Sequence, residues 1–435
     1  MILHRRVMQQ NREIKTIEAP AWFAMDPIAQ RYEALFEELA WKSGGNLTDE
    51  GRHRGRLGHP LAAYLRSYLV MVEEKIESMP KLRQYLCEHP ALVWVVEYRL
   101  VSEASSSYGF AVEASVPSAG HLGVMLRQVK DDELAALLTQ SAQRVLSEDR
   151  PSSSVVVLDV KHQYAYVRQN NALHPPPERF NPARQPRGDR DCRLGFKAAT
   201  NQCGMADPPH DKGQYLWGYG SGIAVVWTST KEGVVLADMT LPFNVNDVTF
   251  APTLLEATLA RLKHVPEVLI ADAAFDAQCV YAYFLDSHST LAIPLNSRGH
   301  PTFRWTADGQ PCCPKDSTPM VGGAPWQERG QPRQAFRCPT CGHTHKLFID
   351  PIHRVRWQLD RSSPAFKRLY RQRTVVERVN SLADTYKLTH PRLRRQSSVA
   401  HRNSFIYIVL NLHVLQRLRQ QRKDTIVNSL YAAAA

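Results

Sequence analysis

Three acidic residues occupy positions in which carboxylates commonly do chemistry. Asp159 lies near the end of an apolar run, 155–160, and Asp272 ends a second one, 267–272. A carboxylate is unfavourable on a buried strand unless it is paired or binds a metal ion. Glu377 lies in a basic segment with helical periodicity. If the two strands are neighbours and the helix packs on them, three carboxylates form the oxygen shell that two Mg²⁺ ions need for phosphodiester chemistry.

Each acid also has an ordinary structural interpretation. Asp159 and Asp272 can begin turns after strands, and Glu377 can pair with Arg373 one helical turn earlier. For any one of them alone this interpretation is favoured. The combination favours a site, because the order along the chain, the type of element and the basic surroundings all agree.

The helical segment that carries Glu377 has one polar face. At 3.6 residues per turn that face holds Tyr370, Arg373, Glu377, Asn380 and Asp384. A face with a carboxylate among cations can dock on the edge of a sheet that presents Asp159 and Asp272.

The elements that must position these residues follow from hydrophobic periodicity. Residues 26–146 are predicted to be mostly helical, and a pattern of strands and helices begins after them. The predicted strands are 155–160, 194–199, 222–228, 234–240, 267–272 and 290–294, and the predicted helices are 249–263, 276–287 and the segment from 364 onward. This order predicts a mixed α/β layer fold. The glycines at 218–222 precede a predicted strand and favour a turn over a phosphate-binding loop.

Changes in composition divide the chain into five predicted parts. They are a helical N-terminal domain for DNA binding or dimerisation (1–150), the first part of a catalytic core (151–295), a Cys-rich insertion (296–350), the last part of the core with basic helices (351–424) and a tail (425–435).

Positive charge is concentrated near the C-terminal end. The 435 residues carry a net charge of +12, and residues 352–424 hold 17 Lys and Arg against four carboxylates. A solvated basic face is the ordinary interpretation, but clustered cations in helical segments favour contact with nucleic acid. No apolar run reaches the ~18 residues of a membrane helix, and no signal peptide is visible, so we expect no membrane partner.

A short turn is the most basic part of this segment. Arg392, Arg394 and Arg395 follow Pro391, which is expected to interrupt the helix, and the nearest acid along the chain is Asp384. Guanidiniums bind phosphate oxygens bidentately, so the turn is expected to grip the DNA backbone. The alternative is a solvated surface turn.

Four of the eight cysteines fall between 312 and 341. Cys338 and Cys341 form a Cys-x2-Cys knuckle, which binds Zn²⁺ tetrahedrally with two further ligands. Those ligands are Cys312 or Cys313 and His343 or His345, and we take Cys313 and His343 as the set. The alternatives are an eroded ribbon without metal or free thiols in a reducing compartment. A redox pair is disfavoured because no βαβ pattern surrounds the knuckle.

Together these motifs resemble the DDE transposases of bacterial insertion sequences. The resemblance runs from about residue 58 to 418 and rests on 157–161, on 269–275 and on the family pattern Tyr-x2-Arg-x3-Glu at Tyr370, Arg373 and Glu377. It implies an RNase H-like core, a mixed sheet flanked by helices, with a helical N-terminal domain; the cysteine spacing adds a zinc-ribbon-like insertion. It also implies double-stranded DNA as partner, both transposon ends and target, and a homodimer on that DNA.

The resemblance further implies roles for individual residues. Asp159, Asp272 and Glu377 would hold Mg²⁺ or Mn²⁺, while Tyr370 and Arg373 position DNA. The family often has a Lys seven residues after the Glu; Asp384 stands there, and Lys387 is the nearest Lys downstream, so it is taken as the DNA contact.

The implied reaction is metal-dependent cleavage at a transposon end, followed by attack of the freed 3′-hydroxyl on target DNA. The alternatives are a non-catalytic DNA-binding protein derived from a transposase and a metal-dependent nuclease without strand transfer. A bacterial, cytoplasmic, nucleoid-associated location is expected.

Overall fold

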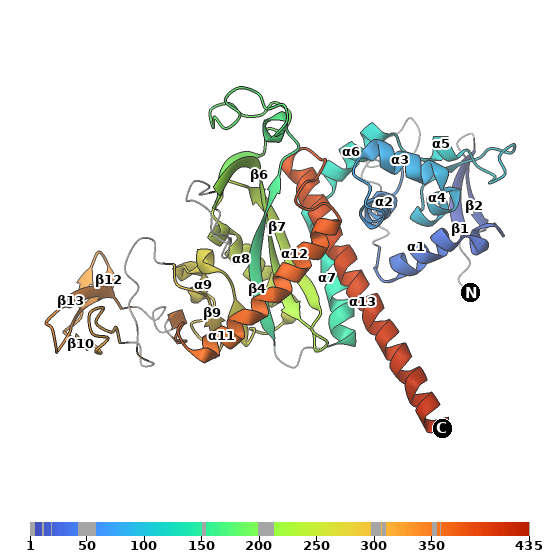
Figure 1. Cartoon of the computed structure of the whole chain (residues 1–435). Coiled ribbons are helices and arrows are strands. Elements are labelled where there is room, and N and C mark those ends of the chain that lie inside the picture. Colours follow the sequence, from blue (N-terminus) through green and yellow to red (C-terminus); the bar gives the residue numbers. More distant parts are fainter. Residues whose placement is uncertain are drawn as a thin grey trace.

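A six-stranded mixed sheet lies at the centre of the computed structural model (Figure 1). The structure describes residues 5–10, 13–18, 20–41, 58–149, 154–198, 213–296, 306, 310–349, 355–356 and 358–434. The strands are β4 (Val155–Tyr164), β5 (Arg193–Ala198), β6 (Gly213–Trp227), β7 (Gly233–Pro242), β8 (Val268–Ile270) and β9 (Thr290–Ala292). Their order is β5-β6-β4-β8-β9, and β7 also pairs with β6. The expected mixed α/β architecture is confirmed.

Both parallel and antiparallel pairs occur in this sheet. β4 pairs antiparallel with β6, which pairs antiparallel with β5 and β7. On its other side β4 pairs parallel with β8, and β8 pairs parallel with β9. β4 is therefore an interior strand, which explains why its first residues form a continuous apolar run rather than an alternating one.

Helices cover both faces of the sheet. Val156 and Leu158 of β4 join a core with α8 (Ala251–Leu262) and α9 (Gln278–Ala282). The alternate residues Val155 and Val157 join a core with α12 (Thr374–Thr385) and α13 (Gln396–Ala434). Successive side chains of a strand point to opposite faces, so Asp159 lies on the α12 side.

The N-terminal part is mostly helical, with one difference from the expectation. Its helices are α1 (Pro27–Glu37), α2 (Leu61–Glu73), α3 (Met79–Glu88), α4 (Pro90–Val96), α5 (Val112–Ser115), α6 (Ala119–Gln128) and α7 (Asp131–Glu148), with a short η1 (Phe23–Met25). β1 (Arg5–Gln10) pairs with β2 (Glu13–Glu18) and with β3 (Leu100–Val101), forming a small sheet that a purely helical domain does not contain. A two-residue strand carries no periodicity by which it could be predicted.

The long helix α13 joins the two parts. It contacts α2, α6 and α7 as well as β7. Its apolar stretch, 405–412, is buried between them, together with the polar Asn403 and Asn411. Asn411 donates to the backbone oxygen of Val235 on β7 and accepts from its N–H (both 2.9 Å). Among the described helices, none has the length and apolar character of a membrane span.

The Cys-rich segment forms a four-stranded sheet of its own, at the left in Figure 1. Its strands are β10 (Val321–Gly322), β11 (Trp326–Glu328), β12 (Gln331–Arg337) and β13 (Thr344–Phe348), in the order β10-β12-β11 with β13 on β12. After it the chain forms α11 (Pro364–Tyr370). The expected junctions at 150/151 and 350/351 lie outside the described residues, as does most of the stretch that follows the one at 295/296.

The expected glycine turn at 218–222 is wrong, because these residues lie within β6 and pair with β4. Close packing explains the glycines. A Cβ on Gly218 would come 2.0 Å from the backbone oxygen of Gln163, and one on Gly222 would come 2.5 Å from a ring carbon of Phe250. The sequence pattern therefore reflects tight contact between strands and with the helical layer.

This packing predicts the effect of adding one methyl group. Gly222→Ala should lower the free energy of unfolding by about 1–3 kcal/mol, because a core that is already full must move to accept it. Gly120→Ala is the matched control: its Cβ meets nothing within 4 Å in α6, so it should be neutral or slightly stabilising. Urea unfolding midpoints of the two variants measure the difference, and equal midpoints would contradict the packing.

Candidate active site

Asp159 and Asp272 lie at the same level of the sheet. Val157 pairs in parallel register with Ile270, the last residue of β8. Asp159, still within β4, lies two residues after Val157. Asp272, the cap of the short helix η4 (Ala273–Phe275), lies two residues after Ile270. Because β8 ends while β4 continues, the two carboxylates are neighbours where the sheet opens.

The helix face predicted around Glu377 docks on Asp159. Arg373, in η5 (Arg371–Arg373), donates from Nη2 to Asp159 Oδ1 at 2.8 Å. Asn380 of α12 donates to Asp159 Oδ2, also at 2.8 Å. The side chain of Asp159 thus has both oxygens paired, and the residue is only 8% exposed.

Burial dominates the electrostatics of these acids. It raises the pKa of Asp159 to about 6; the Arg373 guanidinium opposes this rise, and the neighbouring Asp272 adds to it. Burial also raises the pKa of Asp272, against the hydrogen bond from the backbone N–H of Ala274 (2.9 Å). Two adjacent carboxylates in a poorly solvated place favour a bound cation, because a cation removes both the desolvation penalty and the repulsion.

Glu377 is separated from Asp159 by one guanidinium. Arg373 donates from Nη1 to Glu377 Oε1 at 2.9 Å while its other terminal nitrogen holds Asp159. The ordinary pairing of Glu377 with Arg373 and the expected approach of its helix to Asp159 therefore occur together. Within the described residues, Asp159, Asp272 and Glu377 do not form a group whose oxygens all lie within 4.8 Å of one another.

The sequence interpretation missed a fourth carboxylate beside this pair. Asp247, in η3 (Asp247–Phe250), raises the pKa of both Asp159 and Asp272 through its charge. Its Oδ1 lies 3.6 Å from His162 Nε2 on β4. Asp247, like Asp272, is an acid that comes shortly after a strand. A turn separates it from the end of β7, so the sequence pattern did not connect it with that strand.

Asp384, at the position where the family often has a Lys, takes part in an ion pair. Asp384 Oδ2 lies 3.0 Å from Nζ of Lys161, two residues after Asp159 on β4. Lys387 itself is exposed at the end of α12, where its N–H donates to the backbone oxygen of Asp384. Tyr370 packs flat on Phe366, and burial raises the pKa of its phenol.

Acids that are distant along the chain pair with two arginines of the basic turn. Arg392 Nε lies 3.1 Å from Glu77, and Arg395 Nη1 lies 3.8 Å from Asp191. Arg394 instead lies over the ring of Tyr166, at 5.4 Å. The acids come from distant parts of the chain, so a count of neighbours along the sequence could not find them.

The expected helix break before the arginine turn is present, but it does not lie at Pro391. α12 already ends at Thr385, before the proline, and α13 begins at Gln396.

Three of the predicted cysteines lie together. Cys313, Asp316, Cys338 and Cys341 place one ligand atom each within 4.8 Å of one another. The two thiol sulfurs of Cys313 and Cys341 are 3.5 Å apart. His343, the expected fourth ligand, is not in this group, whose fourth member is Asp316. The signal was present in the sequence, because Cys313-Pro-Lys-Asp316 has the same spacing as Cys338-Pro-Thr-Cys341.

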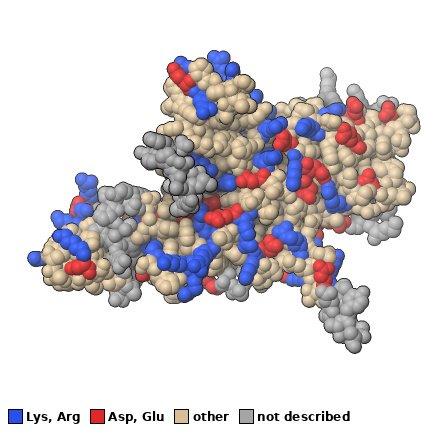
Figure 2. Space-filling view, in the orientation of Figure 1, with Lys and Arg blue, Asp and Glu red and all other residues tan. Residues whose placement is uncertain are grey.

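Basic side chains gather beside the carboxylates. Figure 2 shows Lys and Arg over the region of α11 and the start of α12. Lys367, Arg368 and Arg371 are exposed there and make no ion pair with any described residue. Arg378 lies over the ring of Trp227, at 5.0 Å. This surface is complementary to a polyanion.

Comparison with known proteins identifies a family for the C-terminal half. Residues 195–412 match the family model described as "Transposase DDE domain", a range that includes Asp272 and Glu377. No curated protein sequence matches the chain. One solved structure with some similarity is a cryo-EM structure of the piggyBac transposase synaptic complex with hairpin DNA, at 10% identity and a TM-score of 0.33 over 91% of this chain and 76% of that one. Two chains with so low a score need not share a fold.

The Arg373 contacts predict a large loss of stability when the guanidinium is removed. Arg373→Ala leaves Asp159 buried beside Asp272 without its cation, which should lower the free energy of unfolding by about 3 kcal/mol. Arg371→Ala, which removes an exposed neighbouring Arg without an ion pair, should change it by less than about 0.5 kcal/mol.

Chemical denaturation measures both variants. Adding Asp159→Asn to Arg373→Ala should restore part of the loss, because the uncompensated charge disappears with it. Equal effects of the two arginine variants would show that the pair does not support the fold.

Proposed function

Since this chain belongs to the transposase DDE-domain family, we propose that it cuts DNA at the ends of a transposable element and joins the freed strands to target DNA. The observation that carries the proposal is the parallel register that sets Asp159 and Asp272 side by side beneath the helix of Glu377. That arrangement concentrates acidic oxygens next to an exposed basic surface, which suits phosphodiester chemistry on DNA.

We assign the central sheet and its helices to an RNase H-like core. The order in space, β7-β6-β4-β8-β9 with the first two pairings antiparallel and the last two parallel, supports this assignment. The core then comprises residues 151–295 and 351–424, interrupted by a zinc-ribbon-like insertion at 296–350. The N-terminal domain, 1–150, would serve DNA binding or dimerisation.

The residues at the site fit a divalent cation. Asp159, Asp272 and Glu377 would hold Mg²⁺ or Mn²⁺, since carboxylates are the ligands these ions prefer. Asn380 supports the fit, because it donates to Asp159 while its own Oδ1 is buried without a partner among the described residues. Such ions activate the attacking oxygen and stabilise the leaving oxygen in phosphodiester displacement.

The protein's own side chains would orient the carboxylates and neutralise the charge of the DNA. Arg373 holds both acids, because its Nη1 donates to Glu377 Oε1 and its Nη2 donates to Asp159 Oδ1. The same guanidinium would meet a DNA phosphate that approaches the carboxylates. The half-buried Tyr370, one helical turn earlier, would limit how the strand approaches. No covalent intermediate with the protein is required.

The partners we propose follow from charge and family. Double-stranded DNA, both transposon ends and target, would cross the basic surface of α11 and α12, with Lys387, Arg392, Arg394 and Arg395 as further contacts. Of these four, Lys387 and Arg394 make no ion pair with a described residue. A homodimer would hold two ends, and the protein would act at the bacterial nucleoid.

We also propose that Cys313, Asp316, Cys338 and Cys341 bind one structural Zn²⁺. Thiolate and carboxylate are both zinc ligands, and four close ligand atoms complete a tetrahedral site. Around them only Met320, Phe336 and a few neighbours form a core, which is too small to hold this sheet by itself.

The carboxylate assignment predicts loss of cleavage with retention of binding. Asp159→Asn, Asp272→Asn and Glu377→Gln should each slow Mg²⁺-dependent cleavage of the element's own ends at least about 1,000-fold, because such groups act as a unit. The affinity for the same DNA should change little. Asp286→Asn, an exposed acid elsewhere, is the control. An Asp272→Asn variant that cuts at the wild-type rate would contradict the assignment.

The products of the wild-type protein separate the alternatives. Cut and joined DNA supports a transposase. Cutting without joining indicates a metal-dependent nuclease, and binding without cutting indicates a non-catalytic DNA-binding protein derived from a transposase.

The zinc assignment predicts about one Zn²⁺ per chain in protein purified without chelators, measured by elemental analysis. Cys338→Ser with Cys341→Ser should abolish the zinc, and Asp316→Ala should reduce it. His343→Gln and Cys279→Ser, outside the cluster, should retain it. Zinc that is lost with His343 and kept without Asp316 would restore the ligand set expected from the sequence.

A further inference from the structure

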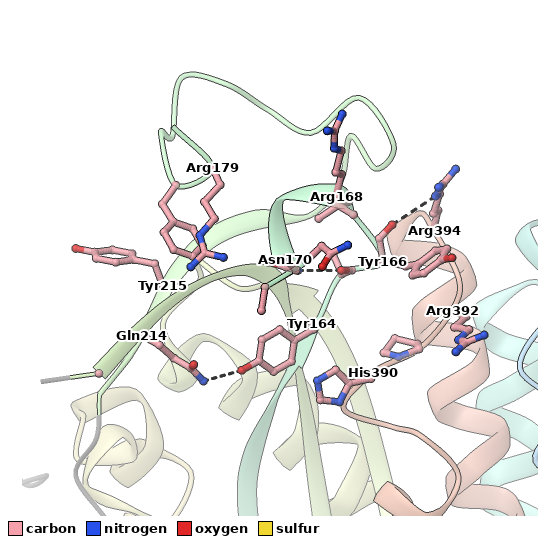
Figure 3. Close-up of a pocket in the computed structure, with 17 residues that line it drawn as sticks. Tyr164, Tyr166, Arg168, Asn170, Arg179, Gln214, Tyr215, His390, Arg392 and Arg394 are labelled. Carbon is pink, nitrogen blue, oxygen red and sulfur yellow. Dashed lines mark hydrogen bonds between the residues drawn. The ribbon is translucent and has the colours of Figure 1, made fainter. Parts of the chain in front are cut away.

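A cavity of about 980 Å³ lies at the end of β4, beyond Asp159 (Figure 3). It is bounded by the end of β4, by η2 (Arg168–Asn170), by the start of β6 and by the segment 390–394. Its volume is that of a pocket for a ligand the size of a nucleotide. Neither the carboxylates nor the cysteine cluster belongs to it.

Flat rings line this pocket. Tyr164, the last residue of β4, stacks on His390 with ring centres 4.5 Å apart and planes 10° from parallel. Tyr215, on β6, is 52% exposed and lies across the pocket from them in Figure 3. An exposed ring gains by stacking on another π face, and every nucleic-acid base offers one.

Four arginines and no carboxylate are found among the described lining residues, and one of these arginines, Arg392, is paired with Glu77 outside the pocket. Arg168 is exposed and makes no ion pair with a described residue. Arg179 lies over the ring of Phe180 at 4.5 Å, and Arg394 lies over Tyr166. A guanidinium that lies over a ring can still donate N–H groups to phosphate oxygens.

The walls of the pocket are fixed by hydrogen bonds. Asn170 donates to the backbone oxygens of Ala165 and Trp217 and accepts from the N–H of Trp217. The indole of Trp217 donates to the backbone oxygen of Arg179 at 2.7 Å. The N–H of Tyr164 donates to the oxygen of Thr389, which fixes His390 beside it. The backbone that carries the rings and cations is therefore held in place before a ligand arrives.

We propose that this pocket binds unpaired nucleotides of a DNA strand, with bases stacked on Tyr164 and Tyr215 and phosphates on the arginines. The bases of a duplex are stacked on each other and cannot offer their faces to these rings, so the pocket distinguishes single from paired strands.

The site deepens the proposed function and rests on it. β4 carries both Asp159 and Tyr164, five residues and about 17 Å apart along the strand. A strand whose phosphate reaches the carboxylates can place unpaired nucleotides in this pocket.

Binding of a labelled 12-nucleotide oligo-dT, compared with a 12-base-pair duplex, tests the proposal by fluorescence anisotropy. Tyr164→Leu should weaken binding of the single strand roughly 10-fold or more, because stacking on one ring is lost. Its affinity for the duplex should change less than about 2-fold. Tyr164→Phe keeps the ring and should retain binding. Tyr108→Leu, at an exposed aromatic residue outside the pocket, is the control.

A second variant tests the phosphate contacts. Arg168→Ala should reduce the slope of log Kd against log salt for the single strand by about 0.7, the value for one lost phosphate contact. Thermal unfolding of every variant checks that the fold is kept.

The outcomes separate this site from the proposed function. Equal weakening of single strand and duplex by Tyr164→Leu, or no weakening of either, would overturn the pocket even if the protein cuts and joins DNA. A selective loss of single-strand binding supports the pocket even if the wild-type protein shows no cleavage, since the measurement requires none.

Discussion

The burial of one carboxylate organises the centre of this protein. Asp159 lies on an interior strand and is stable there because Arg373 and Asn380 pair with its two oxygens. Those partners come from η5 and α12, so the helix must lie close to the sheet. Gly233 permits that approach, since a Cβ there would come 2.7 Å from a methyl group of Val375 on α12. The exposed Glu377 is positioned by the same contact, because Arg373 holds both acids.

The alternation of β4 distributes the rest of the core. One set of its side chains meets α8 and α9, and the other meets α12 and α13, which gives helical layers on both faces of the sheet (Figure 1). α13 extends the second layer to the N-terminal helices, so the two parts share one continuous core. Buried amides reinforce it: Asn403 bonds to Gln163 on β4 and Asn411 to Val235 on β7. A buried amide with all its bonds made fixes the register of a helix on a sheet.

The periphery is stabilised by other means. The small sheet of β10–β13 encloses a small apolar core and the cluster Cys313, Asp316, Cys338 and Cys341, to which we assign a metal under the proposed function. The loops at the end of β4 are held by side-chain bonds to backbone, above all those of Asn170, and they present rings and guanidiniums to solvent. Loops that a rigid core holds in position in this way commonly bind ligands.

The sequence by itself determined the strands around Asp159 and Asp272, the polar helix face of Glu377 and the Cys338 knuckle, because periodicity, burial and knuckle spacing are local properties. Tertiary structure alone decided which charges meet. Glu77 and Asp191 neutralise arginines that are far from them along the chain. The two carboxylate oxygens of Asp159 accept hydrogen bonds from one guanidinium and one amide. The place of Asp247 beside the two acids and the formation of the pocket at Tyr164 have the same cause. Each depends on elements that are distant in sequence, and only packing brings such elements into contact.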